Sequence, residues 1–202
     1  MGVNAVEEIV PILDELKALK AEEEAFSSRY PAYPHPDAPC ERMTPMFNLN
    51  IIEGGIKTNI VPAECRLVLD RRYLPDEDLE AVEARIREAL DRGREHSKAL
   101  EVRADFRHIY RPVVMDEDSP GNVKARKALM EVHGFGEEFP LVGIAGSTDM
   151  GDVQEVLPDI ELIGMGAFSP LTLDKAHAVD ECVGINDLLA LAKQIVYFLT
   201  VP

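Results

Sequence analysis

Five histidines are the first residues of this sequence that could bind a metal ion or move a proton: His35, His96, His108, His133 and His177. No two of them have the His-x-x-x-His spacing of a local metal motif. The first four are predicted to have structural roles. His35 lies in a predicted loop, His96 and His133 lie near predicted helix ends, and His108 lies on a predicted strand. His177 differs, because it lies in a loop after a short apolar stretch and before the last predicted helix, where α/β proteins often place binding residues.

Two glycine-containing segments could hold an anion through their backbone N–H groups. The first, residues 143–152 (Gly-Ile-Ala-Gly-Ser-Thr-Asp-Met-Gly-Asp), joins an apolar stretch to a predicted helix. A tight turn capped by Ser147 or Thr148 explains it equally well. Without a Gly-x-Ser-x-Gly motif, a serine nucleophile is a weak interpretation. The second, residues 54–62 (Gly-Gly-Ile-Lys-Thr-Asn-Ile-Val-Pro), is more simply a hairpin turn.

Composition limits the possible partners. The 202 residues carry a net charge of -16, which argues against nucleic acid as a partner and opposes contact with anionic membranes. Three cysteines without a CxxC pair argue against a disulfide framework and favour a reducing cytoplasm. The first residues lack the basic start and apolar core of a signal peptide, and no apolar run is long enough for a membrane helix.

The first part of the chain predicts helices and strands that alternate as α-β-β-α-β. Apolar residues at helical spacing predict a helix over 6–19, with Asn4 and Glu7 as a capping pair. Pro11 should either kink this helix or trim its start. A proline-rich loop over 27–45 follows. Period-two alternation then predicts a hairpin of strands 47–51 and 65–69, and a further strand over 102–110, with a possible edge strand over 112–115. An amphipathic helix is predicted over 79–90, between the hairpin and the strand over 102–110.

After residue 115 the pattern changes to helices that alternate with short apolar strands, which is typical of an α/β layer. We expect helices over 119–133, just after 149 and over 185–199, with strands over 140–145 and 160–164. The sequence therefore predicts two domains, residues 1–115 and 116–202, and an α+β fold for the first.

Together, these segments resemble a known family. Residues 53–65 (Glu-Gly-Gly-Ile-Lys-Thr-Asn-Ile-Val-Pro-Ala-Glu-Cys) and 69–75 (Leu-Asp-Arg-Arg-Tyr-Leu-Pro) are similar to the lid domain of the two-zinc hydrolases. This family includes acetylornithine deacetylase, succinyl-diaminopimelate desuccinylase, aminoacylase and the glutamate carboxypeptidases. Residues 146–149 (Gly-Ser-Thr-Asp) and the Ala-His-x-x-x-Glu of residues 176–181 also resemble family motifs, in the same order.

The resemblance implies a fold and roles for individual residues. It implies a ferredoxin-like lid, which is a four-stranded antiparallel sheet with two helices, followed by an α/β remnant of the catalytic domain. His177 matches the last zinc ligand, while Asn59 and Arg72 match lid positions that hold the carboxylate of a small substrate. Gly146, Ser147 and Thr148 match the wall of the substrate pocket. The family's lid usually dimerises, so we expect a homo-oligomer.

The remaining zinc ligands and the catalytic base of this family lie upstream of the lid, and this sequence starts at the lid. We therefore expect a truncated amidohydrolase or exopeptidase that binds zinc weakly and is inactive without an N-terminal catalytic half. The alternative is a non-catalytic module for dimerisation or for binding small carboxylates. Either way, an apolar surface should be uncovered near residues 141–144 and Leu162.

Overall fold

The computed structural model describes residues 2–33, 41–134, 136, 142–167 and 178–201. They form two compact units, and each is described separately. Unit 1 contains residues 1–112 and 142–147, and unit 2 contains residues 113–141 and 148–202. Among the described residues, no helix combines the length and the apolarity needed to cross a membrane.

Unit 1 begins with two consecutive helices, α1 (Ala5–Glu8) and α2 (Val10–Glu24). Asn4 caps α1, because its side-chain oxygen accepts a hydrogen bond from Val6 N at 3.1 Å and its amide donates to Glu7 at 2.8 Å. Pro11 lies in the first turn of α2, where its missing N–H costs no helical hydrogen bond. The predicted helix is confirmed, and its break falls at Ile9, two residues before this proline.

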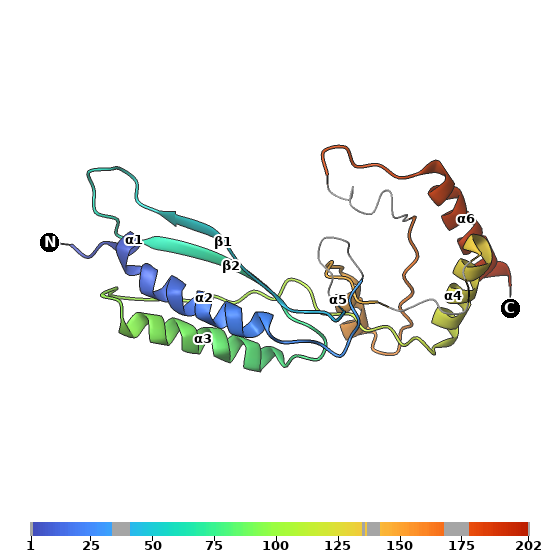
Figure 1. The fold of residues 1–202 in the computed structure, drawn as a ribbon, viewed down its shortest axis with the longest axis horizontal. Helices are drawn as coiled ribbons and strands as arrows, with labels where there is room; N and C mark the ends of the chain where they lie inside the picture. The colour runs from blue at the N-terminus through green and yellow to red at the C-terminus, as the bar shows by residue number, and fades with distance from the viewer. Residues whose placement is uncertain (1, 34–40, 135, 137–141, 168–177, 202) are drawn as a thin grey trace. The chain divides into compact units, whose positions relative to one another are not determined.

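A β-hairpin covers one side of the helices of unit 1 (Figure 1). Strand β1 (Met46–Gly54) pairs with β2 (Cys65–Arg72) in antiparallel register, with a bulge at Asn50. Helix α3 (Leu79–Glu95) follows, capped by Asp78, whose side chain accepts from Ala81 N at 2.9 Å. The hairpin and this helix were both predicted from their apolar periodicity, and both are confirmed.

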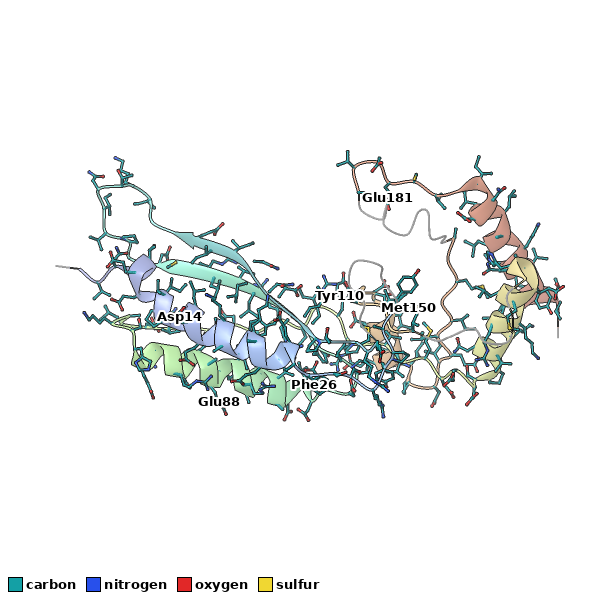
Figure 2. The ribbon with its side chains drawn as sticks, in the orientation of Figure 1. Asp14, Phe26, Glu88, Tyr110, Met150 and Glu181 are labelled. Atoms are coloured by element: carbon teal, nitrogen blue, oxygen red, sulfur yellow. The ribbon has the colours of Figure 1, made fainter. Side chains whose placement is uncertain are left out.

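The core of unit 1 lies between the α2–α3 layer and the hairpin. Helix α2, strand β1 and helix α3 each bury one apolar face in this core, as expected for a layered α+β unit. The buried side chains of this core are Ile9, Ile12, Leu16, Leu19, Phe47, Val82, Ile86 and Ala89. Glu88 lies instead on the outer, exposed side of α3 (Figure 2).

The expected four-stranded sheet is not present in the described residues, which form a two-stranded sheet. The prediction of strands over 102–110 and 112–115 was wrong. Val102 and Phe106 do pack against the core, but Ala104, His108 and Tyr110 are exposed. Alternating apolar residues become a strand only when a neighbouring backbone pairs with them. Among the described residues, no backbone–backbone hydrogen bond involves residues 98–110 or 112–115.

Unit 2 is built mainly from helices in the described part of the chain. Helix α4 (Pro120–His133) begins after the cap Ser119 and ends at Gly134, whose φ of 69° suits glycine. It packs against α6 (Ile185–Thr200), and α5 (Met150–Val156) lies between them in sequence. All three helices were predicted.

The short strands predicted for the second domain were not found. Residues 160–164 form no strand, and of residues 140–145 the described ones form only an isolated bridge at Gly143. The predicted apolar surface is found only in part. Ile144 is 72% exposed, whereas Leu162 is 5% exposed, and Leu141 lies outside the described residues.

Helices α2 and α3 approach each other closely at Gly93. A Cβ atom at this position would lie 2.6 Å from the Cα of Ile12. We therefore predict that Gly93→Ala lowers the thermal unfolding midpoint by a few degrees. The gain in helix propensity, about 1 kcal/mol, is smaller than the usual overpacking cost of about 1–3 kcal/mol. Glu88→Ala on the outer face is the control, and a higher midpoint for Gly93→Ala would contradict the helix packing.

Candidate functional site

Arg72, the last residue of β2, is an exposed cation whose guanidinium is held by two neighbouring groups of unit 1. Its guanidinium Nε lies 3.2 Å from Asp70 Oδ2, and its Nη1 donates to the carbonyl oxygen of Ala145 at 2.8 Å. The side chain remains 45% exposed. Arginine has five N–H donors in a planar fork, and in the described part of the chain no partner engages Nη2. This end of the guanidinium can therefore receive an anion.

A backbone contact far away in sequence brings Ala145 to Arg72. Gly143 N donates to Pro31 O at 2.7 Å, and Tyr33 N donates to Gly143 O at 3.1 Å. A Cβ atom on Gly143 would lie 2.7 Å from Cγ of Met43, so this close pairing requires glycine. The pairing holds the short segment 142–147 within unit 1. Sequence patterns did not reveal the pairing of Gly143 with Pro31 and Tyr33, since this pairing joins two loops.

Gly146 and Ser147 follow Ala145 directly and are both exposed. No hydrogen bond between described residues uses their backbone N–H groups. The segment therefore places two backbone donors next in sequence to the carbonyl that holds Arg72. Backbone N–H groups beside a guanidinium can share the two oxygens of a carboxylate. The structure thus brings three of the predicted substrate-binding residues, Arg72, Gly146 and Ser147, into one part of unit 1.

The turn after Arg72 is fixed by a second carboxylate, Asp76. Ser28 Oγ donates to Asp76 Oδ1 at 2.8 Å, and Arg29 N donates to Oδ2 at 2.9 Å. Burial alone would raise the pKa of Asp76. The hydrogen bonds from Arg29 and Ser28 outweigh that effect and lower the pKa below its ordinary value. Asp76 is thus ionised at neutral pH, and it ties the loop after α2 to the end of β2.

Asn59, the other predicted carboxylate ligand, is at the opposite end of the hairpin. It is exposed in the loop that joins β1 to β2, where Ile60 N donates to Lys57 O at 3.2 Å and closes a turn. Arg72 is the last of the eight residues of β2, so the length of this strand separates it from the loop. At roughly 3.3 Å per residue, that distance is more than 20 Å. One chain therefore cannot use Asn59 and Arg72 on the same small carboxylate.

The other predicted site residues are not part of this arrangement. Thr148 belongs to unit 2, where its Oγ1 accepts from Met150 N at 3.3 Å and supports the start of α5. His177 lies outside the described residues, as does His35. His108 was expected on an apolar strand face. It is instead 49% exposed, and its Nε2 lies 3.0 Å from Glu83 Oε1.

A metal centre is not formed by the described residues. They contain no group of three or more His, Cys, Asp or Glu side chains close enough to hold an ion. A zinc site needs three or four protein ligands. The described residues therefore do not fit a zinc ion by themselves, and no zinc-dependent step is assigned to them.

Comparison with known proteins shows what most of unit 1 is similar to. Residues 1–97 match the M20 peptidase dimerisation domain. Succinyl-diaminopimelate desuccinylase from Marinobacter nauticus is 27% identical over 147 residues, which are 73% of this chain and 35% of that protein. The chain thus spans little more than a third of this curated relative.

Two solved structures share the fold. An M20 family metallo-carboxypeptidase from Sulfolobus solfataricus has a TM-score of 0.58 and 20% identity, covering 96% of this chain and 44% of that one. The dipeptidase Dug1p from Saccharomyces cerevisiae has a TM-score of 0.59 and 19% identity. The match covers 77% of this chain and 33% of Dug1p. Residues 1–97 therefore match the dimerisation domain of the M20 peptidases, and the chain is similar in sequence to one M20-type hydrolase and in fold to two M20 peptidase structures.

Proposed function

We propose that this chain is the lid and a C-terminal catalytic-domain portion of a metal-dependent amidohydrolase or exopeptidase. Its substrate would carry a free carboxylate next to the N-acyl or peptide bond that is cleaved. The activities of the similar proteins, a desuccinylase, a metallo-carboxypeptidase and a dipeptidase, support this class of substrate. The single observation that carries the proposal is the exposed guanidinium of Arg72, held on Ala145 beside Gly146 and Ser147.

In this proposal the chain binds and orients the substrate. The Nη2 end of Arg72 would bind one carboxylate oxygen, and backbone N–H groups of Gly146 or Ser147 would bind the other. Two-point binding fixes the plane of the carboxylate, which sets the direction of the bond to be cleaved. Asp70 would limit rotation of the guanidinium, because its Oδ2 accepts a hydrogen bond from Nε at 3.2 Å.

Asn59 can take part only from a second copy of the chain. The two ends of one hairpin lie too far apart for one small substrate, so an Asn59 that meets it must come from a partner. The dimerisation domain in residues 1–97 supports a homo-oligomer. A dimer would therefore be part of the binding site, and not only a means of stability.

Strand β1 offers the edge for such a dimer. One of its edges pairs with β2, and among the described residues the other edge has no partner strand. Ile51 and Ile52 are 48% and 55% exposed. A shallow depression beside this edge, lined by Lys17, Lys20 and Asn48 among others, joins α2 to the same surface. Unpaired edge strands with exposed apolar residues tend to pair with another chain.

Catalysis needs groups that the described residues do not supply. In the complete hydrolase, zinc would polarise the scissile carbonyl and activate a water molecule. We therefore propose that this chain alone is inactive and that an N-terminal catalytic half completes the site. The alternative, a non-catalytic module for dimerisation or carboxylate binding, uses the same Arg72 site and the same β1 edge. The two differ only in whether hydrolysis follows binding.

Titration with N-acetylglycine, followed by NMR, tests the binding site. We expect shifts at Arg72 Nε and at the amides of Gly146 and Ser147, with a dissociation constant of about 1 mM or weaker, near -4 kcal/mol. Arg72→Met should weaken binding about tenfold or more, because charge-assisted hydrogen bonds worth about 1.5–3 kcal/mol are lost.

Arg92→Met is the matched control, since Arg92 is 48% exposed and pairs with Glu15 far from this site. Binding that survives in Arg72→Met but not in Arg92→Met would place the carboxylate elsewhere. The same samples, supplied with zinc, should not hydrolyse N-acetylglycine. Clear turnover by the chain alone would contradict the proposed inactivity.

The oligomeric state tests the role of β1. Light scattering should give twice the chain mass of 22.4 kDa for the unmodified chain. Ile52→Lys should shift the mass toward one chain, because a charge on the edge strand opposes pairing. Ile109→Lys, at a position that is 69% exposed outside the hairpin, should leave the dimer intact. A monomer without any substitution, or a dimer that Ile52→Lys leaves unchanged, would be evidence against this interface.

A further inference from the structure

A buried cluster of charges lies directly behind Arg72. The Arg71 side chain is 5% exposed, and its guanidinium binds Glu23, which is 1% exposed, and Glu77, which is 9% exposed. These residues come from the end of β2, the end of α2 and the turn before α3. We call Arg71, Glu23 and Glu77 the Arg71 cluster.

Stability alone does not account for the Arg71 cluster. Removing charges from water is costly, and well-packed apolar residues often stabilise a fold as well as a buried ion pair does. One carboxylate oxygen of Glu23 has no hydrogen-bond partner among the described residues, although Arg85 Nη1 lies 3.5 Å away. The buried charges of the Arg71 cluster are therefore incompletely hydrogen-bonded. We look for a role of these charges that apolar residues could not perform.

The Arg71 cluster holds the backbone that directly follows Arg72. Arg71 Nη1 donates to the carbonyl oxygen of Arg72 at 2.7 Å. Glu77 Oε2 accepts from Leu74 N at 2.7 Å, and it also lies 3.3 Å from Arg71 Nη1. The same ionic group therefore fixes two successive peptide groups, the one between Arg72 and Tyr73 and the one between Tyr73 and Leu74.

The direction of Arg72 follows from that of Arg71. Successive side chains of a strand point to opposite faces of the sheet. Because Arg71 is anchored inward by two carboxylates, Arg72 must point outward, where its guanidinium meets Ala145 O. A strand end without this anchor would be free to fray or to change its twist, and the long side chain of Arg72 would move with it.

We propose that Arg71, together with Glu23 and Glu77, is a positioning device that locks the backbone of Arg72 and so keeps its guanidinium ready for a substrate carboxylate. This rests on the proposed function, because Arg72 is taken as the carboxylate ligand. Arg71 itself touches no substrate. Its planar guanidinium can bind two carboxylates and a carbonyl oxygen together, which a lysine ammonium cannot reproduce in the same geometry.

The mobility of the Arg72 side chain tests the device directly. ¹⁵N relaxation at Arg72 Nε should show an ordered N–H in the unmodified chain. In Arg71→Lys the order parameter should fall into the flexible range, below about 0.6. The affinity for N-acetylglycine should fall several-fold in the same variant, while the amide shifts of the β1–β2 hairpin stay in place. Arg92→Lys, which alters an exposed ion pair on α3, should change neither quantity.

A second variant covers the case in which Arg71→Lys does not fold. The triple substitution Glu23→Leu, Arg71→Met and Glu77→Gln removes the charges without leaving one of them buried and unpaired. It should fold and yet release Arg72 in the same way. If Arg72 Nε stays ordered in a folded variant, the positioning role is overturned. If Arg72 becomes mobile as expected but the unmodified chain never binds N-acetylglycine, the positioning role of Arg71 is supported. The proposed role of Arg72 as a carboxylate ligand is then wrong.

Discussion

The hydrogen bond from Arg72 to the carbonyl of Ala145 joins residues 73 positions apart, and the candidate site depends on it. The contact needs a strand end that does not move, which the Arg71 cluster supplies. It also needs the 142–147 segment to lie in unit 1, which the pairing of Gly143 with Pro31 and Tyr33 supplies. Neither arrangement follows from local sequence preference. Both are tertiary constraints that act on one exposed guanidinium.

Local physics explains most of the elements that the sequence predicted correctly. Helices were recognised from apolar residues at 3.6-residue spacing, and their starts from caps such as Asn4, Asp78 and Ser119. The hairpin was recognised from alternation around a glycine turn. Residues 102–110 carry the same alternation, yet form no strand. Strand formation depends on a neighbouring backbone, which a pattern within the segment cannot report.

The site was predictable in part. The sequence resemblance selected Arg72, Gly146 and Ser147, and the structure brings them into the same unit. It also selected Asn59, but the length of β2 sets that residue at the far end of the hairpin. The role of Gly143 was missed, because its partners lie in a loop without regular structure. Arg71 was missed too, because only burial distinguishes it from the arginine beside it.

The most direct test of this account is whether Arg72 lies on the 142–147 segment in solution. A NOESY spectrum of the chain should show contacts between the Arg72 Hδ protons and protons of Ala145 or Gly146. Contacts between Ala32 and Gly143, which form the isolated bridge, serve as the internal reference. If the reference contacts and the β1–β2 cross-strand contacts are present but those of Arg72 are absent, the candidate site does not exist as described.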